Sequence, residues 1–352
     1  MSFVAVHFED GSEKKFAVAE DTLISQLIQK VATKLDIRQD IESFSIFESI
    51  DGQEHCLKPT ERCIPKQGAT LVFKKRYFFA KHPEDETLVH LQYIQLREDV
   101  LRGNYCLTDT EACKLGAIAM HEAYGRPDMQ KHRAGFLVKS NQLTRFVPQL
   151  SFKNRKPEEW EKMLLAEYHQ WSPDLQPKTL PTPHHAKLEY MEQLEAMKPN
   201  LYGSTFFYGW ELVVENQLVK ERIKVTIAIS KFGIVTFRHT SKTHREVLHS
   251  HSFQEIAGWA INPAFMTFVY TIPAADPAAP PDRFTFESSA AEEITPLCET
   301  LAHLIMQSMQ AAATPAAEAP ATAAAVAEVA APAPAVAAPA PEAAPAPAAP
   351  SS

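Results

Sequence analysis

Apolar and polar positions along residues 1–77 change from alternation to helical spacing and back again. Two alternating runs, FVAVHF and KKFAV, flank an Asp-Gly pair, which predicts a β-hairpin. In DTLISQLIQKVATKL the apolar residues recur every three or four positions, which predicts a helix capped by Asp21 or Thr22. FSIFES, a second Asp-Gly turn and TLVFKK predict further strands. We therefore expect a small sheet that packs on one helix.

Helical spacing dominates residues 82–198. LVHLQYIQLREDVLRG predicts a helix that ends at Gly103, because glycine accepts the left-handed conformation that closes many helices. Thr108 and Glu111 form a capping-box pattern at the start of the next helix. Pro157 and the Thr182-Pro183 pair are typical of the first turns of two more helices. A compact helical lobe is expected here.

Residues 201–310 return to strand patterns. ELVVEN, KVTIAIS, GIVTFRH, VLHSHSF and DRFTFES are separated by turn signals every 8 to 12 residues, as in a sandwich or barrel. A closing helix follows, with Ile294, Leu297, Cys298, Leu301, Ile305 and Met309 on one face. Pro296 conflicts with a helix capped by Ser289 and Glu292, so the sequence predicts either a start at Thr295 or a kink.

Composition separates the last 42 residues from the rest of the chain. Residues 311–352 are nearly all Ala, Pro and Val, without an aromatic residue, which predicts a disordered, partly polyproline-like tail. The chain carries a net charge of −8, and the glutamates Glu318, Glu328 and Glu342 after residue 310 leave −5 for the remainder. This balance argues against a nucleic-acid partner.

Several classes of function lack their signatures. No apolar run reaches the length of a membrane helix and the start is not a secretion signal, so any membrane contact is expected to be peripheral. The five cysteines form no C-x-x-C pair, which predicts reduced thiols in a cytosolic protein. No phosphate-binding loop, nucleophile elbow or zinc-protease motif is present. We therefore expect neither an enzyme nor a cofactor.

Four longer stretches resemble FERM domains, and those of talin heads in particular. They are RYFFAKHPEDETLVHLQYIQLREDVLRG, QKHRAGFL, AKLEYMEQLEAMKPNLYGSTFF and HREVLHSHSFQEIAGWAINPAFMTF. The resemblance covers about residues 1–310 and departs from talins in four respects. No extra lobe before the first lobe, no long insertion within it and no talin rod are found in this sequence, and Gly258 stands where the family often has a basic residue.

The resemblance implies an α+β multidomain fold with three lobes and a tail. Residues 1–77 would form a ubiquitin-like β-grasp and residues 82–198 a helical bundle like acyl-CoA-binding protein. Residues 201–310 would form a PH/PTB-like β-sandwich with its C-terminal helix, followed by the disordered tail at 311–352.

Trp259 is the first candidate binding residue. On a strand, Ala257, Trp259 and Ile261 share one face and Ile256, Gly258 and Ala260 share the other. The indole is either ordinary core or one wall of a groove. The resemblance implies the groove, in which a receptor tail with an NPxY motif, as in integrins, adds a strand to the sheet. The expected groove residues are Ile256, Ala257, Gly258, Trp259, Ala260, Ile261, Leu301 and Ile305.

Basic residues form the second candidate site. In "KERIK" the cations Lys220, Arg222 and Lys224 alternate along a predicted strand and point the same way. Such a stripe either binds lipid or protects a solvated strand edge from pairing. The resemblance implies that these cations, with Lys131, Arg133, Lys153, Arg155 and Lys156 of the helical lobe, bind acidic phospholipids and phosphoinositides of the inner leaflet.

The remaining clusters lead to weaker hypotheses. His249 and His251 would share a strand face, but no further ligand completes a metal site, and surface histidines are the expectation. Taken together, the sequence predicts a cytoplasmic adaptor at the plasma membrane whose partners are a receptor tail, acidic lipids and cytoskeletal proteins. The alternative is a scaffold of ezrin-like or myosin-tail type that binds phosphoinositides and other proteins but adds no strand.

Overall fold

The computed structural model describes residues 2–170, 182–215, 218–241, 244–276 and 278–313. Residues Met1–Ser308 form one compact unit, and the second unit begins at Met309. The predictions for the Ala/Pro-rich tail fall almost entirely outside the described residues. Every described helix is too short or too polar to cross a bilayer.

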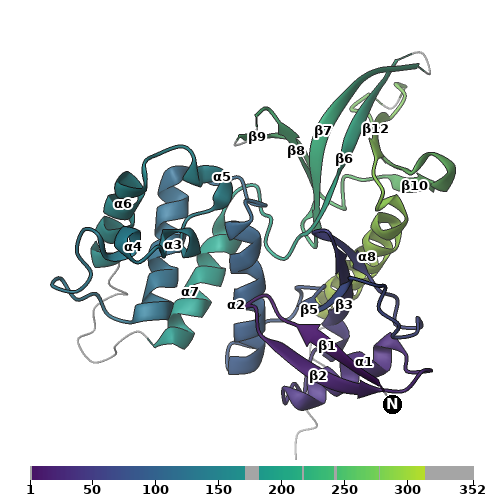
Figure 1. The fold of residues 1–352 in the computed structure, drawn as a ribbon. Coiled ribbons are helices and arrows are strands. Elements are labelled where there is room, and N and C mark those ends of the chain that lie inside the picture. Colours follow the sequence, from purple (N-terminus) through teal and green to yellow (C-terminus); the bar gives the residue numbers. More distant parts are fainter. Residues whose placement is uncertain (1, 171–181, 216–217, 242–243, 277, 314–352) are drawn as a thin grey trace, which may run out of the picture. The chain divides into compact units, whose positions relative to one another are not determined.

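The first lobe is a five-stranded sheet that packs on one helix (Figure 1). The strand order is β2-β1-β5-β3-β4, with β1 and β5 parallel and the other pairs antiparallel. Helix α1 buries Ile24, Leu27, Ile28 and Val31. The elements are β1 (Ser2–His7), β2 (Glu13–Val18), α1 (Ile24–Lys34), η1 (Ile41–Ser43), β3 (Phe44–Ile50), β4 (Gln53–Cys56) and β5 (Thr70–Lys75).

The predicted cap of α1 is wrong. The helix begins at Ile24 with Leu23 at the N-cap, and the side-chain oxygen of Gln26 accepts the Leu23 N–H at 3.0 Å. Thr22 is buried, and its hydroxyl oxygen accepts the N–H of Ala19 at 2.8 Å. Its side chain therefore bonds to the preceding turn and does not cap α1.

The second lobe consists of helices, and its predicted ends are confirmed. Thr108 and Glu111 form the capping box of α3, Thr182 caps α7, and Gly103 after α2 has φ +79°. A Cβ on Gly116 would lie 2.6 Å from both Leu164 and the Phe146 carbonyl oxygen, so only glycine allows this approach. The helices are α2 (Glu86–Leu101), α3 (Asp109–Tyr124), α4 (Phe136–Lys139), α5 (Gln149–Phe152), α6 (Pro157–Gln170) and α7 (Pro183–Ala196), with the 3-10 turn η2 (Leu143–Arg145).

The third lobe is a continuous antiparallel sheet of order β10-β11-β12-β6-β7-β8-β9. Its ends fold together into the predicted sandwich, because His251 of β9 lies 3.0 Å from the Tyr270 hydroxyl of β11, and its ring lies 5.0 Å from that of Phe284 of β12. The elements are β6 (Thr205–Glu215), β7 (Leu218–Ser230), β8 (Gly233–His239), β9 (Arg245–His251), β10 (Gly258–Asn262), η3 (Pro263–Phe265), β11 (Thr267–Ile272), β12 (Asp282–Glu287) and α8 (Ala291–Ala313).

Helix α8 resolves the alternatives left open by Pro296. It begins at Ala291, and Pro296 lies inside the helix, so Thr295 is not its cap. Near its start, the hydroxyl of Ser288, and not of Ser289, accepts the N–H of Ala290 at 3.2 Å. The predicted apolar face is confirmed where Ile294, Leu297, Cys298 and Leu301 join the core of the third lobe.

Candidate functional site

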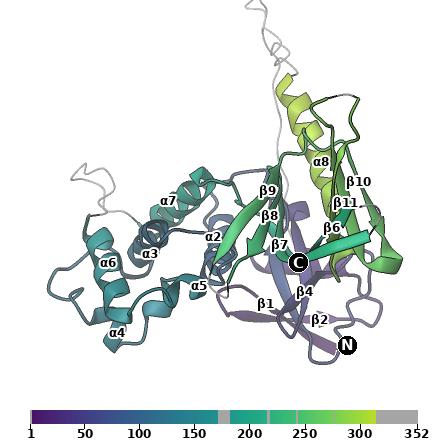
Figure 2. The ribbon, with the colours of Figure 1, turned by 90° about the horizontal axis from the view of Figure 1, so that it is seen from above.

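Strand β10 forms one edge of the third-lobe sheet. It pairs with β11 from Gly258 to Asn262 and has no second strand neighbour among the described residues. In an antiparallel ladder, alternate residues direct their N–H and C=O groups away from the paired strand. Figure 2 shows β10 and β11 beside α8. The backbone of this edge is therefore available to an added strand.

The two edges of the sheet differ in how well they are protected from pairing with a strand of another chain. Strand β9 carries Arg245, Glu246, His249 and His251, and its register with β8 shifts at an irregularity. Charges and bulges of this kind discourage pairing with another chain. Strand β10 has the sequence GWAIN and no charged residue. A Cβ on Gly258 would meet no atom within 4 Å, so the space beside it is open.

Trp259 is half-buried. It is therefore neither a fully buried core residue nor a fully exposed groove wall, the two alternatives that the sequence left open. With Ile261 it packs partly against the third-lobe core, and its ring lies 6.0 Å from that of Phe253 in an edge-on arrangement. Part of the indole surface therefore remains accessible beside the open edge of β10.

The other expected groove residues divide between surface and core. Ala257 and Ala260 are exposed, and Ile305 of α8 is half-buried. Ile256 and Leu301 are only 8% and 2% exposed, which contradicts their assignment as groove walls. Their side chains belong to the core of the third lobe, together with other residues of the sheet and α8.

The five cations of the helical lobe that were predicted to bind lipid lie in two loops. Lys131 and Arg133 are exposed between α3 and α4, whereas the neighbouring His132 is buried. The loop is fixed by Glu161 of α6, whose buried carboxylate accepts the N–H groups of Gly135, Leu137 and Val138 at 2.6, 2.6 and 3.1 Å. A carboxylate with three such donors holds its loop firmly.

The second loop joins α5 and α6. Lys153 and Lys156 are exposed and have no ion-pair partner in the described part of the chain. Arg155 differs, since its Nε lies 2.6 Å from the carboxylate of Asp109. The two lysines are therefore the cations of this loop that are free to bind an anion.

Only one of the three cations that were predicted to form a stripe on β7 is unpaired among the described residues. Lys220, Arg222 and Lys224 are exposed at alternate positions. The Arg222 guanidinium lies 2.6 Å from Glu287, and Lys220 lies 3.8 Å from Glu215. Lys224 has no ion-pair partner among the residues that the structure describes.

The histidines of the third lobe pack as structural residues. His249 and His251 stack with ring centroids 6.0 Å apart, and each contacts the ring of Phe284. His249 Nε2 lies 2.9 Å from Glu211. Burial lowers the pKa of His251. No group of three potential metal ligands occurs within the described residues.

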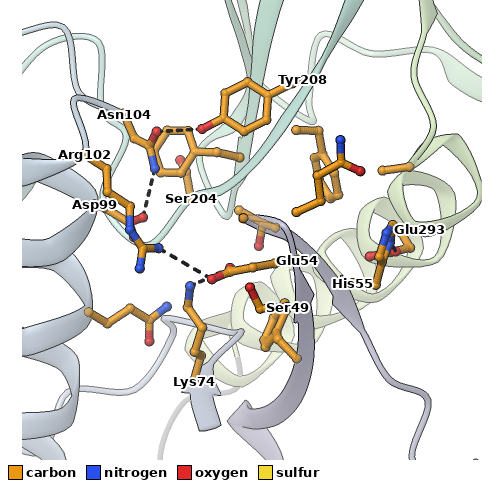
Figure 3. Close-up of a pocket in the computed structure, with 18 of the residues that line it drawn as sticks. Ser49, Glu54, His55, Lys74, Asp99, Arg102, Asn104, Ser204, Tyr208 and Glu293 are labelled. Carbon is orange, nitrogen blue, oxygen red and sulfur yellow. Dashed lines mark hydrogen bonds and ion pairs between the residues drawn. The ribbon is translucent and has the colours of Figure 1, made fainter. Parts of the chain in front are cut away.

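A cavity of about 330 Å³ lies where the three lobes meet, and the sequence did not predict it (Figure 3). Glu54 and Lys74 line it from the first lobe, Asp99 and Asn104 from the second and Tyr208 from the third. The signal was present in α2, where the polar residues Gln92, Gln95 and Asp99 are buried at helical spacing. Polar residues on the apolar stripe of a helix indicate buried hydrogen bonding.

Opposite charges meet at this cavity. The ammonium of Lys74 lies 2.7 Å from Glu9 and 2.8 Å from Glu54, and Arg102 lies 2.8 Å from Glu9. Burial would lower the pKa of Lys74, but these two carboxylates raise it. Burial raises the pKa of Asp99 to about 7, against the opposing effect of the Lys74 charge. The cations are thus already paired, which disfavours the cavity as an anion site.

Two protein-family models match this chain, one over the first lobe and one over the second. A model of the FERM central domain matches residues 80–207, and a model of an RA-like domain matches residues 1–64. The FERM domain of Drosophila Merlin, solved in complex with its C-terminal domain, has a TM-score of 0.63 over 88% of this chain and 98% of that one, at 18% identity. The chain is a FERM domain protein. The FERM likeness also includes the C-terminal MyTH4-FERM domain of human Myosin 7b, with a TM-score of 0.62 at 17% identity over 87% of this chain and 60% of that one.

The relatives in sequence are FERM proteins and talins. FERM domain-containing protein C of Dictyostelium discoideum is 28% identical over 266 residues, which are 73% of this chain and 16% of the relative. Talin-B of the same organism is 23% identical over 269 residues, which are 74% of this chain and 9% of the relative. This FERM chain therefore spans a small part of the relatives it matches.

Proposed function

We propose that this FERM protein is a cytoskeleton-linked adaptor at the cytoplasmic face of the plasma membrane. Its third lobe binds the cytoplasmic tail of a transmembrane receptor, of the integrin NPxY type, through strand addition at β10. Its exposed cations bind acidic phospholipids, including phosphoinositides. Similarity to talins supports the link to the cytoskeleton.

The open edge of β10 carries the receptor part of the proposal. This edge has no second strand neighbour among the described residues, no charge and a half-exposed indole beside it. An added peptide strand gains main-chain hydrogen bonds, and side-chain pockets supply its specificity. Trp259 is suited to such a pocket because partly buried aromatic residues contribute much of the binding energy in interfaces.

An NMR titration of the intact chain with an NPxY peptide tests strand addition. We expect amide shifts within Gly258–Asn262 and in the Trp259 indole, and none within Arg245–His251 at the opposite edge. Two peptides N-methylated at alternate residues provide a matched pair, because only one set of amides faces β10. One methylated peptide should bind and the other should not. Equal binding of both, or shifts confined to another surface, would contradict strand addition.

The lipid part rests on cations without carboxylate partners. Lys131, Arg133, Lys153, Lys156 and Lys224 are exposed and unpaired among the described residues. Each basic residue near an anionic membrane adds about 1 kcal/mol of attraction. Because the net charge of the chain is −8, its attraction to an anionic membrane depends on where these cations lie and not on the total charge.

The alternative function is a scaffold of ezrin-like or myosin-tail type that binds phosphoinositides and other proteins. The observation that favours it is Gly258, which stands where the talin resemblance implies a basic residue. Vesicle binding without any response of β10 to NPxY peptides would support this alternative.

A further inference from the structure

One face of the third-lobe sheet carries basic and aromatic residues across four neighbouring strands, β6 to β9 (Figure 1). Residues directly opposite each other on paired strands point to the same face of a sheet. Trp210 of β6 pairs with Lys224 of β7. His239 of β8 pairs with Arg245 of β9. Each pair therefore shares one face.

The register between β7 and β8 shows that both pairs lie on the same face. Thr226, two positions after Lys224, pairs with Phe237, which lies two positions before His239. Side chains two positions apart on a strand share a face. The Thr226 hydroxyl oxygen also lies 2.8 Å from His239 Nε2, which requires that the two side chains point the same way.

Exposed aromatic and aliphatic side chains complete this surface. Tyr208 lies two positions before Trp210 on β6, and Val247 lies two positions after Arg245 on β9. Tyr208 is 51% exposed, and Trp210 and Val247 are each 41% exposed. We refer to Tyr208, Trp210, Lys224, Arg245 and Val247 as the cationic face. Tryptophan, tyrosine and arginine are the residues that contribute most to binding in protein interfaces.

The positive charge of the cationic face is not compensated. Lys224 is exposed and Arg245 is half-buried, and neither has an ion-pair partner in the part of the chain that the structure describes. The Nη1 atom of Arg245 is buried and has no hydrogen-bond partner among the described residues. Arg222 differs, since Glu287 neutralises it. A partly buried charge without a counter-ion is costly, and a bound anion would remove that cost.

The charges of Lys224 and Arg245 act on the histidine between them. Burial, together with the charges of Arg245 and Lys224, lowers the pKa of His239 to about 4. His239 is therefore neutral near pH 7 and adds no charge of its own. The Arg245 charge also opposes the rise that burial causes in the pKa of Cys106, which lies between α2 and α3. Arg245 thus lies where the cationic face borders the second lobe.

We propose that the cationic face binds an acidic segment of a partner protein, with an apolar side chain of the segment on Tyr208, Trp210 and Val247. Carboxylates of the segment pair with Lys224 and Arg245, which this chain leaves without counter-ions. A protein is favoured over a membrane because an extended segment can reach a half-buried guanidinium beside the second lobe, whereas a flat bilayer cannot. Strand β10 lies at the other end of the strand order, so this surface is separate from the proposed receptor site.

Fluorescence anisotropy of the intact chain with a labelled acidic peptide tests the inference. In this probe glutamates flank a central phenylalanine, and in the control peptide lysines replace the glutamates. We expect the acidic peptide alone to bind, and Arg245→Gln to weaken its binding about tenfold or more, because a partly buried charge partner is lost. Arg238→Gln is the matched control, since Arg238 lies on the opposite face and pairs with Glu246. Unchanged affinity of Arg245→Gln, or equal binding of the two peptides, would overturn the inference.

Trp210→Ala separates the apolar contact from charge attraction. This variant should bind the acidic peptide about tenfold more weakly at every salt concentration, because an apolar contact is not screened. Arg245→Gln should instead reduce the dependence of affinity on salt. A peptide with glycine in place of phenylalanine should bind the unmodified chain less tightly and bind Trp210→Ala as its parent does. Wild-type affinity of Trp210→Ala would overturn the inference.

Two further measurements exclude a structural role and a lipid site. Thermal unfolding of Arg245→Gln should be unchanged or occur at a higher temperature, since the removed charge has no counter-ion. A clear decrease would assign Arg245 a structural role and overturn the inference. Binding to phosphatidylserine vesicles is the second measurement, because Lys224 also belongs to the proposed lipid-binding cations. Loss of vesicle binding in Arg245→Gln, at unchanged peptide affinity, would make this surface a membrane site and overturn the inference.

The inference and the proposed function fail separately. A chain that binds neither anionic vesicles nor an NPxY peptide, but still binds the acidic peptide through Arg245, would contradict the proposed function alone. Binding of the acidic peptide that shifts Gly258–Asn262 in NMR spectra and leaves the Trp210 indole unchanged would place the peptide at β10 and overturn the inference.

Discussion

The Tyr208 hydroxyl of β6 donates a hydrogen bond of 2.9 Å to the side-chain oxygen of Asn104, which follows α2 (Figure 3). The same amide donates to Asp99 at 3.0 Å. Strand β6 is thereby connected to a buried carboxyl group whose pKa is raised to about 7 by burial. The protonation of Asp99 therefore affects a contact between the second and third lobes near neutral pH.

Substitution of Asp99 by Asn should stabilise the protein at pH 8 and have a smaller effect near pH 5. The folded state favours the protonated form, because the pKa rises from 3.8 to about 7. The wild type thus loses stability as the pH rises from about 4 to 7, by at most about 1.4 kcal/mol per pH unit. Thermal unfolding across this range measures the difference, with the exposed Asp21→Asn as control. An equal effect of Asp99→Asn at both pH values would contradict the assignment.

Trp259→Ala should weaken NPxY-peptide binding about tenfold or more, because a rigid apolar wall beside β10 is lost. Isothermal titration calorimetry measures this affinity. Trp210→Ala is the matched control, since Trp210 is an exposed indole on β6, which β11 and β12 separate from β10. A similar loss in both variants would indicate that the peptide binds elsewhere.

Lys153→Glu with Lys156→Glu should reduce affinity for phosphoinositide vesicles by about tenfold or more at low salt. Arg155→Glu should have a weaker effect on attraction, because the Arg155 charge is already compensated by Asp109. Vesicle co-sedimentation over a salt series compares the two, with Lys15→Glu on β2 as control. A loss of affinity for Arg155→Glu as large, per reversed charge, as that for the lysine pair would contradict a role of the ion pair.

Glu161→Gln should destabilise the second lobe by about 2 kcal/mol, because an uncharged amide oxygen replaces an acceptor of three N–H groups. Urea denaturation measures the loss. The variant should also weaken vesicle binding slightly, since the carboxylate fixes the loop that carries Lys131 and Arg133. The exposed Glu158→Gln on the same helix should change neither property.

The sequence predicted the element order well because local patterns determined it. Alternation gave the strands, and Thr108, Thr182 and Gly103 gave helix ends that the structure confirms. The α1 cap failed because Thr22 bonds back to Ala19, a turn contact that competes with capping. The polar residues Gln92, Gln95 and Asp99 on α2 could have indicated buried hydrogen bonding, but not the cavity itself, since Glu54, Asp99 and Tyr208 approach one another only after the lobes pack.

Placement of the binding candidates also depended on tertiary contacts. Alternation predicted that Lys220, Arg222 and Lys224 share one face; all three are exposed, and the register of β7 with β6 shifts beside Lys220. It could not show that Glu287 of β12 would neutralise Arg222, because the two residues are 65 positions apart. Ile256 and Leu301 were assigned to the groove by resemblance, but burial in the core removes them from its surface.

The position of β10 at the rim of the sheet has a mechanical consequence. A tail bound alongside this strand and pulled along its axis would load all of its main-chain bonds together, in shear. The same tail pulled at a right angle to the strand axis would break those hydrogen bonds one after another. The attachment would therefore resist tension from one direction much better than from the other.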